Sequence, residues 1–232
     1  GEEEEEDGAE EENEKEAADR AVAQEVFGAV KKGVRDVVLL AKTRPDDASL
    51  QYWCLDGIAS LCVGNEGNRG VCATTGGVEL IARNFKTFIE DKRVVVKCCW
   101  AVVAMAADYA ADLGDENVVE SLVQALQEQP ANYDLQAIGV RALSILVEDG
   151  ANLKRARDCG APGRVQFVMD AHPDDGQLIF RSQTLLDKLT PPGAGEEHGT
   201  RLEHFQSRGK ILEDGTVVPG SKNVGTKQKR GS

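Results

Sequence analysis

The chain has 232 residues, 41% of them hydrophobic, and a formal net charge of −13. These values fit one folded domain with polar tails. Much of the charge is local: residues 1–20 carry twelve Asp or Glu against two basic residues, whereas residues 21–189 carry a net charge of −5. A mildly acidic folded part lacks the basic face of a general nucleic-acid binder, so nucleic acid is not an expected partner.

The sequence shows no pattern typical of secretion or membrane insertion. Its first residues are mostly glutamates and lack the basic-then-apolar order of a signal peptide. The most apolar stretch, residues 94–107, is interrupted by Lys97 and is shorter than the roughly 20 residues that a membrane span needs. We therefore expect no transmembrane segment.

The cysteines are expected to be reduced packing residues. They form no C-x-x-C pair and have no neighbouring His, which argues against a zinc site. Most of them fall in apolar helical segments, where a free cysteine behaves as a small hydrophobic residue. Free thiols are typical of the cytoplasm or nucleus, which we predict as the location. The six are Cys54, Cys62, Cys72, Cys98, Cys99 and Cys159.

In chain order, residues 1–16 form a low-complexity acidic run, predicted to be a disordered tail or helical only at its end. An amphipathic helix is predicted from 17 to about 32, and Gly33 separates it from a second helix over 34–42. Pro45 then disfavours helix at the preceding residue, and the aspartates that follow it can cap the next helix.

A helical segment recurs along the rest of the chain. Its apolar residues lie at helical spacing, as in the stripe Leu50, Cys54, Ile58 and Leu61. Successive copies begin 45, 40 and 43 residues apart, and this period is typical of a helical solenoid that binds other proteins. The copies are residues 50–61, 95–106, 135–146 and 178–189.

The connecting segments also repeat. Residues 68–88 and 152–169 each read as a short polar helix, a Gly-Gly or Gly-Ala junction and an apolar helix, and residues 117–127 are a shortened version. Residues 193–232 lack periodicity and are predicted to be a disordered tail. The weak basic cluster at 227–230 could be a nuclear signal, a membrane-surface contact or an aid to solubility.

A short helix, a Gly-Gly or Gly-Ala junction, a helix and then the pattern LQxxxLxxIxxL, at this spacing, resembles the armadillo repeat. HEAT repeats are similar in length but lack the glycine junction. The resemblance implies an all-α, right-handed superhelix of about four repeats over residues 17–192. It also implies a non-catalytic scaffold whose groove, lined by the third helix of each repeat, holds a partner protein or an extended peptide. The alternative is a regulatory or targeting domain of a larger enzyme or cytoskeletal assembly.

The resemblance also nominates groove residues. The positions follow from an alignment of the four copies on Ile58, Val103, Leu143 and Leu186. At these positions the Trp-x-x-x-Asn ladder of the importin-like branch is absent, and the two tryptophans are assigned to packing. An ordinary solvated face is the other interpretation; a true groove could hold the acidic end of a peptide near its basic residues. The nominated residues are Asp56, Ser60, Met105, Arg141, Thr184 and Lys188.

No catalytic constellation stands out in the sequence. His172, His198 and His204 have no nucleophile at a recognisable motif spacing. The acidic segment 170–175 is interpreted as a turn with a helix cap rather than a metal cluster. The glycines of residues 64–70 follow a helix and so more plausibly end it than bind phosphate. We expect no enzymatic activity, cofactor, metal or small-molecule substrate.

Overall fold

The computed structural model describes residues 2–190, 209–211 and 217–219, with side chains for residues 12–190. Within this part the chain is all-helical apart from two short strands, which confirms the predicted all-α class. β1 (Gly209–Ile211) pairs antiparallel with β2 (Val217–Pro219). The helices are α1 (Glu2–Val30), α2 (Val34–Thr43), α3 (Ala48–Cys62), α4 (Glu66–Thr74), α5 (Gly77–Thr87), α6 (Lys92–Asp115), α7 (Val118–Glu128), α8 (Tyr133–Leu146), α9 (Gly150–Asp158), α10 (Ala161–Ala171) and α11 (Gly176–Leu189).

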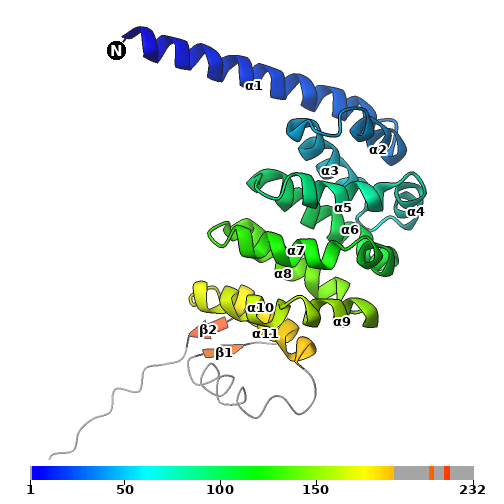
Figure 1. Cartoon of the computed structure of the whole chain (residues 1–232), viewed down its shortest axis with the longest axis vertical. Helices are drawn as coiled ribbons and strands as arrows, with labels where there is room; N and C mark the ends of the chain where they lie inside the picture. Colours follow the sequence, from blue (N-terminus) through cyan, green and yellow to red (C-terminus); the bar gives the residue numbers. More distant parts are fainter. Residues whose placement is uncertain (1, 191–208, 212–216, 220–232) are drawn as a thin grey trace, which may run out of the picture.

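The helices follow one another along the long axis of the molecule, and eight of them, α2, α3, α5, α6, α7, α8, α10 and α11, form two layers (Figure 1). In one layer α2 packs on α5, α5 on α7 and α7 on α10. In the other layer α3 packs on α6, α6 on α8 and α8 on α11. One continuous core, from Val26 to Leu189, runs between the layers. Each helix therefore buries its apolar stripe against neighbours about one period away in sequence.

A residue with positive φ precedes each helix of the first layer. Gly33, Gly76 and Gly160 begin α2, α5 and α10 in this way, and Asn117 begins α7 with φ 63°. A Cβ disfavours this conformation, which explains the recurring glycine, and Asn is one of the few other residues that tolerate it. The sequence pattern missed this junction before α7 because asparagine stands where glycine was expected.

A side-chain cap begins each helix of the second layer. Asp47, Asp91, Asn132 and Asp175 each accept a hydrogen bond from the backbone N–H three residues further along. Such a cap satisfies a donor at the helix N-terminus that has no partner within the helix. The four caps fix the register of α3, α6, α8 and α11 in the same way.

Two buried glutamines at equivalent positions form hydrogen bonds between the two layers. Gln51 Nε2 donates to the carbonyl oxygens of Ala41 and Arg44, at the end of α2. Gln136 Nε2 does the same to Leu126 and Gln129, at the end of α7. These bonds help to satisfy carbonyls at the C-terminal ends of helices, where the carbonyls of Arg44 and Gln129 also accept from the backbone N–H groups of Asp47 and Asn132. They give the Gln of the LQ pattern a structural role.

The structure differs from the predictions for the two tails where it describes them, and one prediction lies outside the described residues. Residues 2–16 belong to helix α1, so the predicted acidic tail is helical here. Glutamate is a good helix former, and acidic residues near the N-terminus stabilise a helix because they interact favourably with its dipole. In the predicted C-terminal tail, β1 and β2 are paired strands, and the basic cluster at 227–230 lies outside the described residues.

The central helix α6 is longer than the sequence pattern predicted. It runs through Tyr109, whose backbone (φ −125°, ψ 29°) kinks the helix, and continues to Asp115. It is the one helix in the described part that is long and apolar enough to cross a membrane by length and composition. Half of its most apolar window is buried inside the structure, where it packs against α3, α5 and α8. Such burial is typical of a core helix.

Candidate functional site

The four caps bring one row of side chains into the same register on neighbouring helices. The ninth residue after each cap is Asp56 on α3, Trp100 on α6, Arg141 on α8 and Thr184 on α11. Trp100, Arg141 and Thr184 are exposed, and Asp56 is partly exposed. We call the surface that carries this row the α3/α6/α8/α11 face. Its side chains differ in charge and size, as expected for positions that do not serve the core.

A cavity of about 400 Å³ opens on this face across α3, α6 and α8. It brings together three of the six nominated residues, namely Asp56, Ser60 and Arg141. Its volume lies in the range of ligand-binding clefts, and its lining mixes apolar walls with a few charged groups. The remaining lining residues are Ala59, Val63, Lys97, Trp100, Val103 and Ala104.

Two of the residues that line this cavity form an ion pair. Lys97 Nζ donates to Asp56 Oδ1 at 2.6 Å, across 41 residues of sequence. Burial disfavours the charged amine, yet the hydrogen bond to Asp56 and its negative charge raise the pKa of Lys97 above its ordinary value. The Lys97 amine also lies 5.0 Å from the centre of the Tyr52 ring. Lys97 and Asp56 therefore largely neutralise each other.

The other cation of the cavity, Arg141, has no carboxylate partner among the described side chains. The guanidinium carbon of Arg141 lies 5.6 Å from the centre of the Trp100 ring, within the range of a cation–π contact. No ion pair involves Arg141 among the side chains of residues 12–190. The cavity thus contains one uncompensated positive charge beside a large aromatic ring that is 41% exposed.

Two assignments on α6 are wrong. Met105 is fully buried and belongs to the core, and Trp100 is exposed rather than a packing residue. The sequence alignment on Val103 was displaced by one residue, and one residue turns a side chain by about 100° around a helix. The cap Asp91, visible in the sequence, would have given the register that places Trp100 and Ala104 on the face. Trp100 is followed four residues later by Ala104, so the pair is still not Trp and Asn.

The two nominated residues on α11 do not reach this cavity. Lys188 forms an ion pair with Glu148, which follows α8. Thr184 Oγ1 donates to the carbonyl oxygen of Phe180 within its own helix. The structure therefore divides the nominated set: Asp56, Ser60 and Arg141 line one cavity, and the α11 residues lie apart from it.

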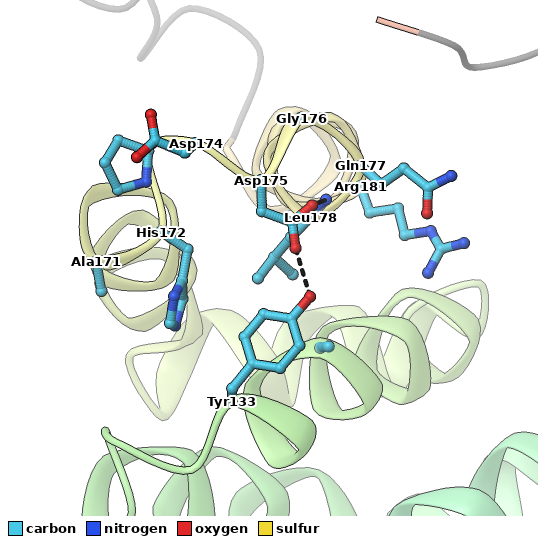
Figure 2. Close-up of a pocket in the computed structure, with 11 residues that line it drawn as sticks. Tyr133, Ala171, His172, Asp174, Asp175, Gly176, Gln177, Leu178 and Arg181 are labelled. Atoms are coloured by element: carbon cyan, nitrogen blue, oxygen red, sulfur yellow. Dashed lines mark hydrogen bonds between the residues drawn. The ribbon is translucent and has the colours of Figure 1, made fainter.

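A second cavity, of about 830 Å³, lies where α8, α10 and α11 meet (Figure 2). Tyr133 Oη donates to Asp175 Oδ2 at 2.5 Å, and the ring of His172 lies edge-on to that of Tyr133, with 5.4 Å between ring centres. The hydrogen bond raises the pKa of Tyr133 and lowers the pKa of Asp175. Asp175 also caps α11, which confirms the predicted turn with a helix cap.

The titratable groups of the described residues form no recognisable catalytic arrangement. No group of three His, Cys, Asp or Glu in this part could hold a metal ion. Burial raises the pKa of Cys54 to about 12, and burial also raises the pKa of Cys98. The pKa of Cys62 is lowered by a hydrogen bond with Cys72, but both thiols are fully buried. A buried thiol out of reach of substrate is a packing residue rather than a nucleophile.

Comparison with known proteins found no family model, no curated protein and no solved structure that matches this chain.

Proposed function

We propose that residues 17–192 form an armadillo-like, right-handed superhelix of about four repeats. On this proposal the protein is a non-catalytic scaffold that binds a partner protein or an extended peptide on the α3/α6/α8/α11 face. The proposal includes an intracellular location, in the cytoplasm or nucleus, because the six cysteines are free and five of them are buried.

The hydrogen bonds that link successive helices support a repeating architecture. Many of them join residues 40 to 42 apart, which is about one sequence period. Asn132 Nδ2, for example, donates to the carbonyl oxygen of Lys92, and Asn152 Nδ2 donates to that of Ala110. Nearest-neighbour contacts at a fixed period are typical of repeat proteins, whose stacked units present a stiff, extended surface.

The observation that carries the binding function is the row Asp56, Trp100, Arg141 and Thr184. Equivalent positions in a purely structural repeat would need only to be polar. Here the centre of the row holds an exposed tryptophan beside an arginine, and both line a cavity. Tryptophan and arginine are among the residues enriched at the energetic centres of protein interfaces.

The test is affinity capture by the full chain, comparing the wild type with Trp100→Ala and Arg141→Glu. A matched control is Arg35→Glu, the same charge reversal at an exposed arginine on α2, in the other layer. Far-ultraviolet circular dichroism and thermal unfolding must show that all variants are folded. We expect captured proteins to be lost with both face variants and retained with Arg35→Glu. Equal capture by all four proteins would refute this surface as the binding site.

A further inference from the structure

We infer that the cavity across α3, α6 and α8 binds an extended peptide through two neighbouring side chains, one bulky and apolar and the other a carboxylate. The apolar side chain packs against Trp100, and the carboxylate binds Arg141. This inference rests on the proposed function and names the chemical class of its partner.

The apolar half of the site is formed by the exposed face of Trp100 and the walls beside it. Val63 is 63% exposed and Trp100 is 41% exposed, so apolar surface around the cavity is in contact with water. Ala59 and Val103 complete this wall. An aliphatic or aromatic side chain entering the cavity would remove this surface from water, and a polar one would not gain from it.

The charged half of the site selects an anion. Of the two cations that line the cavity, Lys97 is already paired with Asp56, and Arg141 has no carboxylate among the described residues. An aspartate or glutamate of the peptide can accept two N–H bonds from the guanidinium of Arg141. A lysine or arginine of a peptide would instead meet Arg141 as a like charge, and would find Asp56 already engaged.

The contact between Arg141 and Trp100 makes the two halves one site. Their placement on neighbouring helices, with the cation over the ring, sets the apolar and anionic subsites next to each other. Ordering a long arginine side chain costs conformational entropy, and an existing ring contact reduces that cost when a ligand binds. The partner is therefore expected to carry its apolar and acidic residues close together in sequence.

The experiment uses the full chain carrying Trp53→Phe, so that fluorescence reports Trp100 alone. The probes are short synthetic peptides of equal length in a Gly/Ser background, acetylated and amidated to remove terminal charges. One peptide carries Leu with Glu, and the others carry Leu with Gln, Leu with Lys, and Ala with Glu. Each pair is tested both adjacent and separated by one residue. We expect the Leu and Glu peptide to bind about tenfold more tightly than each of the other three.

The variant Arg141→Gln should abolish the preference for Glu over Gln and keep the preference for Leu over Ala. Arg93→Gln is the matched control, because Arg93 is also an exposed arginine of this layer, 5.5 Å from the Tyr52 ring, and it does not line the cavity. It should leave both preferences intact. Arg141→Lys should retain part of the Glu preference, because a charge remains without the planar fork.

Tightest binding of the Leu and Lys peptide, equal binding of all four peptides, or no binding of any would overturn the inference. So would a Glu preference that survives Arg141→Gln. Failure here can be distinguished from failure of the proposed function. If these preferences are absent while Trp100→Ala still abolishes protein capture, the peptide class alone is wrong. If Trp100→Ala captures the same proteins as wild type, both proposals fail.

Discussion

Arg141 on α8 lies over the ring of Trp100 on α6, with 5.6 Å between the guanidinium carbon and the ring centre. The two residues are the ninth after their caps, Asn132 and Asp91, so the same register places both on the α3/α6/α8/α11 face. Both are exposed. This cation–aromatic contact joins two helices, and the fluorescence of Trp100 can report the charge of Arg141.

Trp100 should be quenched by iodide more strongly when Arg141 is present. Iodide is an anion and concentrates near the uncompensated positive charge, whereas acrylamide is neutral. In a Trp53→Phe background, Arg141→Gln should lower the Stern–Volmer constant for iodide and leave that for acrylamide unchanged or slightly higher. The difference should shrink at high salt. An equal change for both quenchers would indicate a change in exposure rather than in charge.

The left-handed backbone at Gly160 should make this position sensitive to substitution. Its φ is +85° and no atom would contact an added Cβ, so any cost comes from the backbone alone. Gly160→Ala should lower the free energy of unfolding by about 1–2 kcal/mol. Gly163, inside α10, also has open space around it, so Gly163→Ala should instead stabilise by roughly 0.5 kcal/mol. Urea denaturation of both variants measures the contrast, and a loss of stability in both would argue against the conformational explanation.

The buried glutamine of α8 should contribute substantially to stability. Gln136 donates to two carbonyl oxygens at the end of α7 and accepts from Arg164 Nη2 at 2.9 Å. Gln136→Ala would remove the donor to the Leu126 carbonyl and the acceptor for Arg164 Nη2 at a buried position, and should cost about 2–3 kcal/mol. Gln124→Ala, at an exposed position of α7, should stay within about 0.5 kcal/mol of wild type. Similar midpoints for the two variants in chemical denaturation would contradict the assigned role.

The hydrogen bond between Tyr133 and Asp175 should make stability depend on acid pH. Hydrogen bonds from Tyr133 and from the backbone lower the pKa of Asp175 in the folded state. A carboxylate whose pKa is lower in the folded state than in the unfolded state stabilises the folded protein. This contribution is complete above the unfolded-state pKa of about 3.9 and is lost as the pH falls through the folded-state pKa. Tyr133→Phe should therefore raise the pKa of Asp175 and reduce stability at neutral pH, with a smaller difference in acid. Carboxyl titration by NMR, with unfolding at both pH values, checks both effects; an unchanged Asp175 pKa would exclude the tyrosine as a cause.

Much of the fold could be read from local sequence signals. The period, the apolar stripes and the glycine junctions at Gly33, Gly76 and Gly160 correspond to helices and helix starts in the structure. These features depend on interactions within a few residues, such as caps and backbone conformation. The kink of α6 at Tyr109 was not predicted, because no glycine or proline marks it.

The sequence pattern did not predict which side chains of the candidate site are exposed and which of them pair, because both depend on tertiary structure. An error of one residue in the alignment of α6 placed the buried Ala101 and Met105 on the face instead of Trp100 and Ala104, since adjacent residues of a helix point in different directions. The pairing of Lys97 with Asp56 joins residues 41 apart, and it leaves Arg141 as the lining cation that has no ion pair among the described side chains. The sequence by itself determined the helices and their period, because both follow from local chemistry. Only packing between successive helices decided which side chains meet on the exposed face.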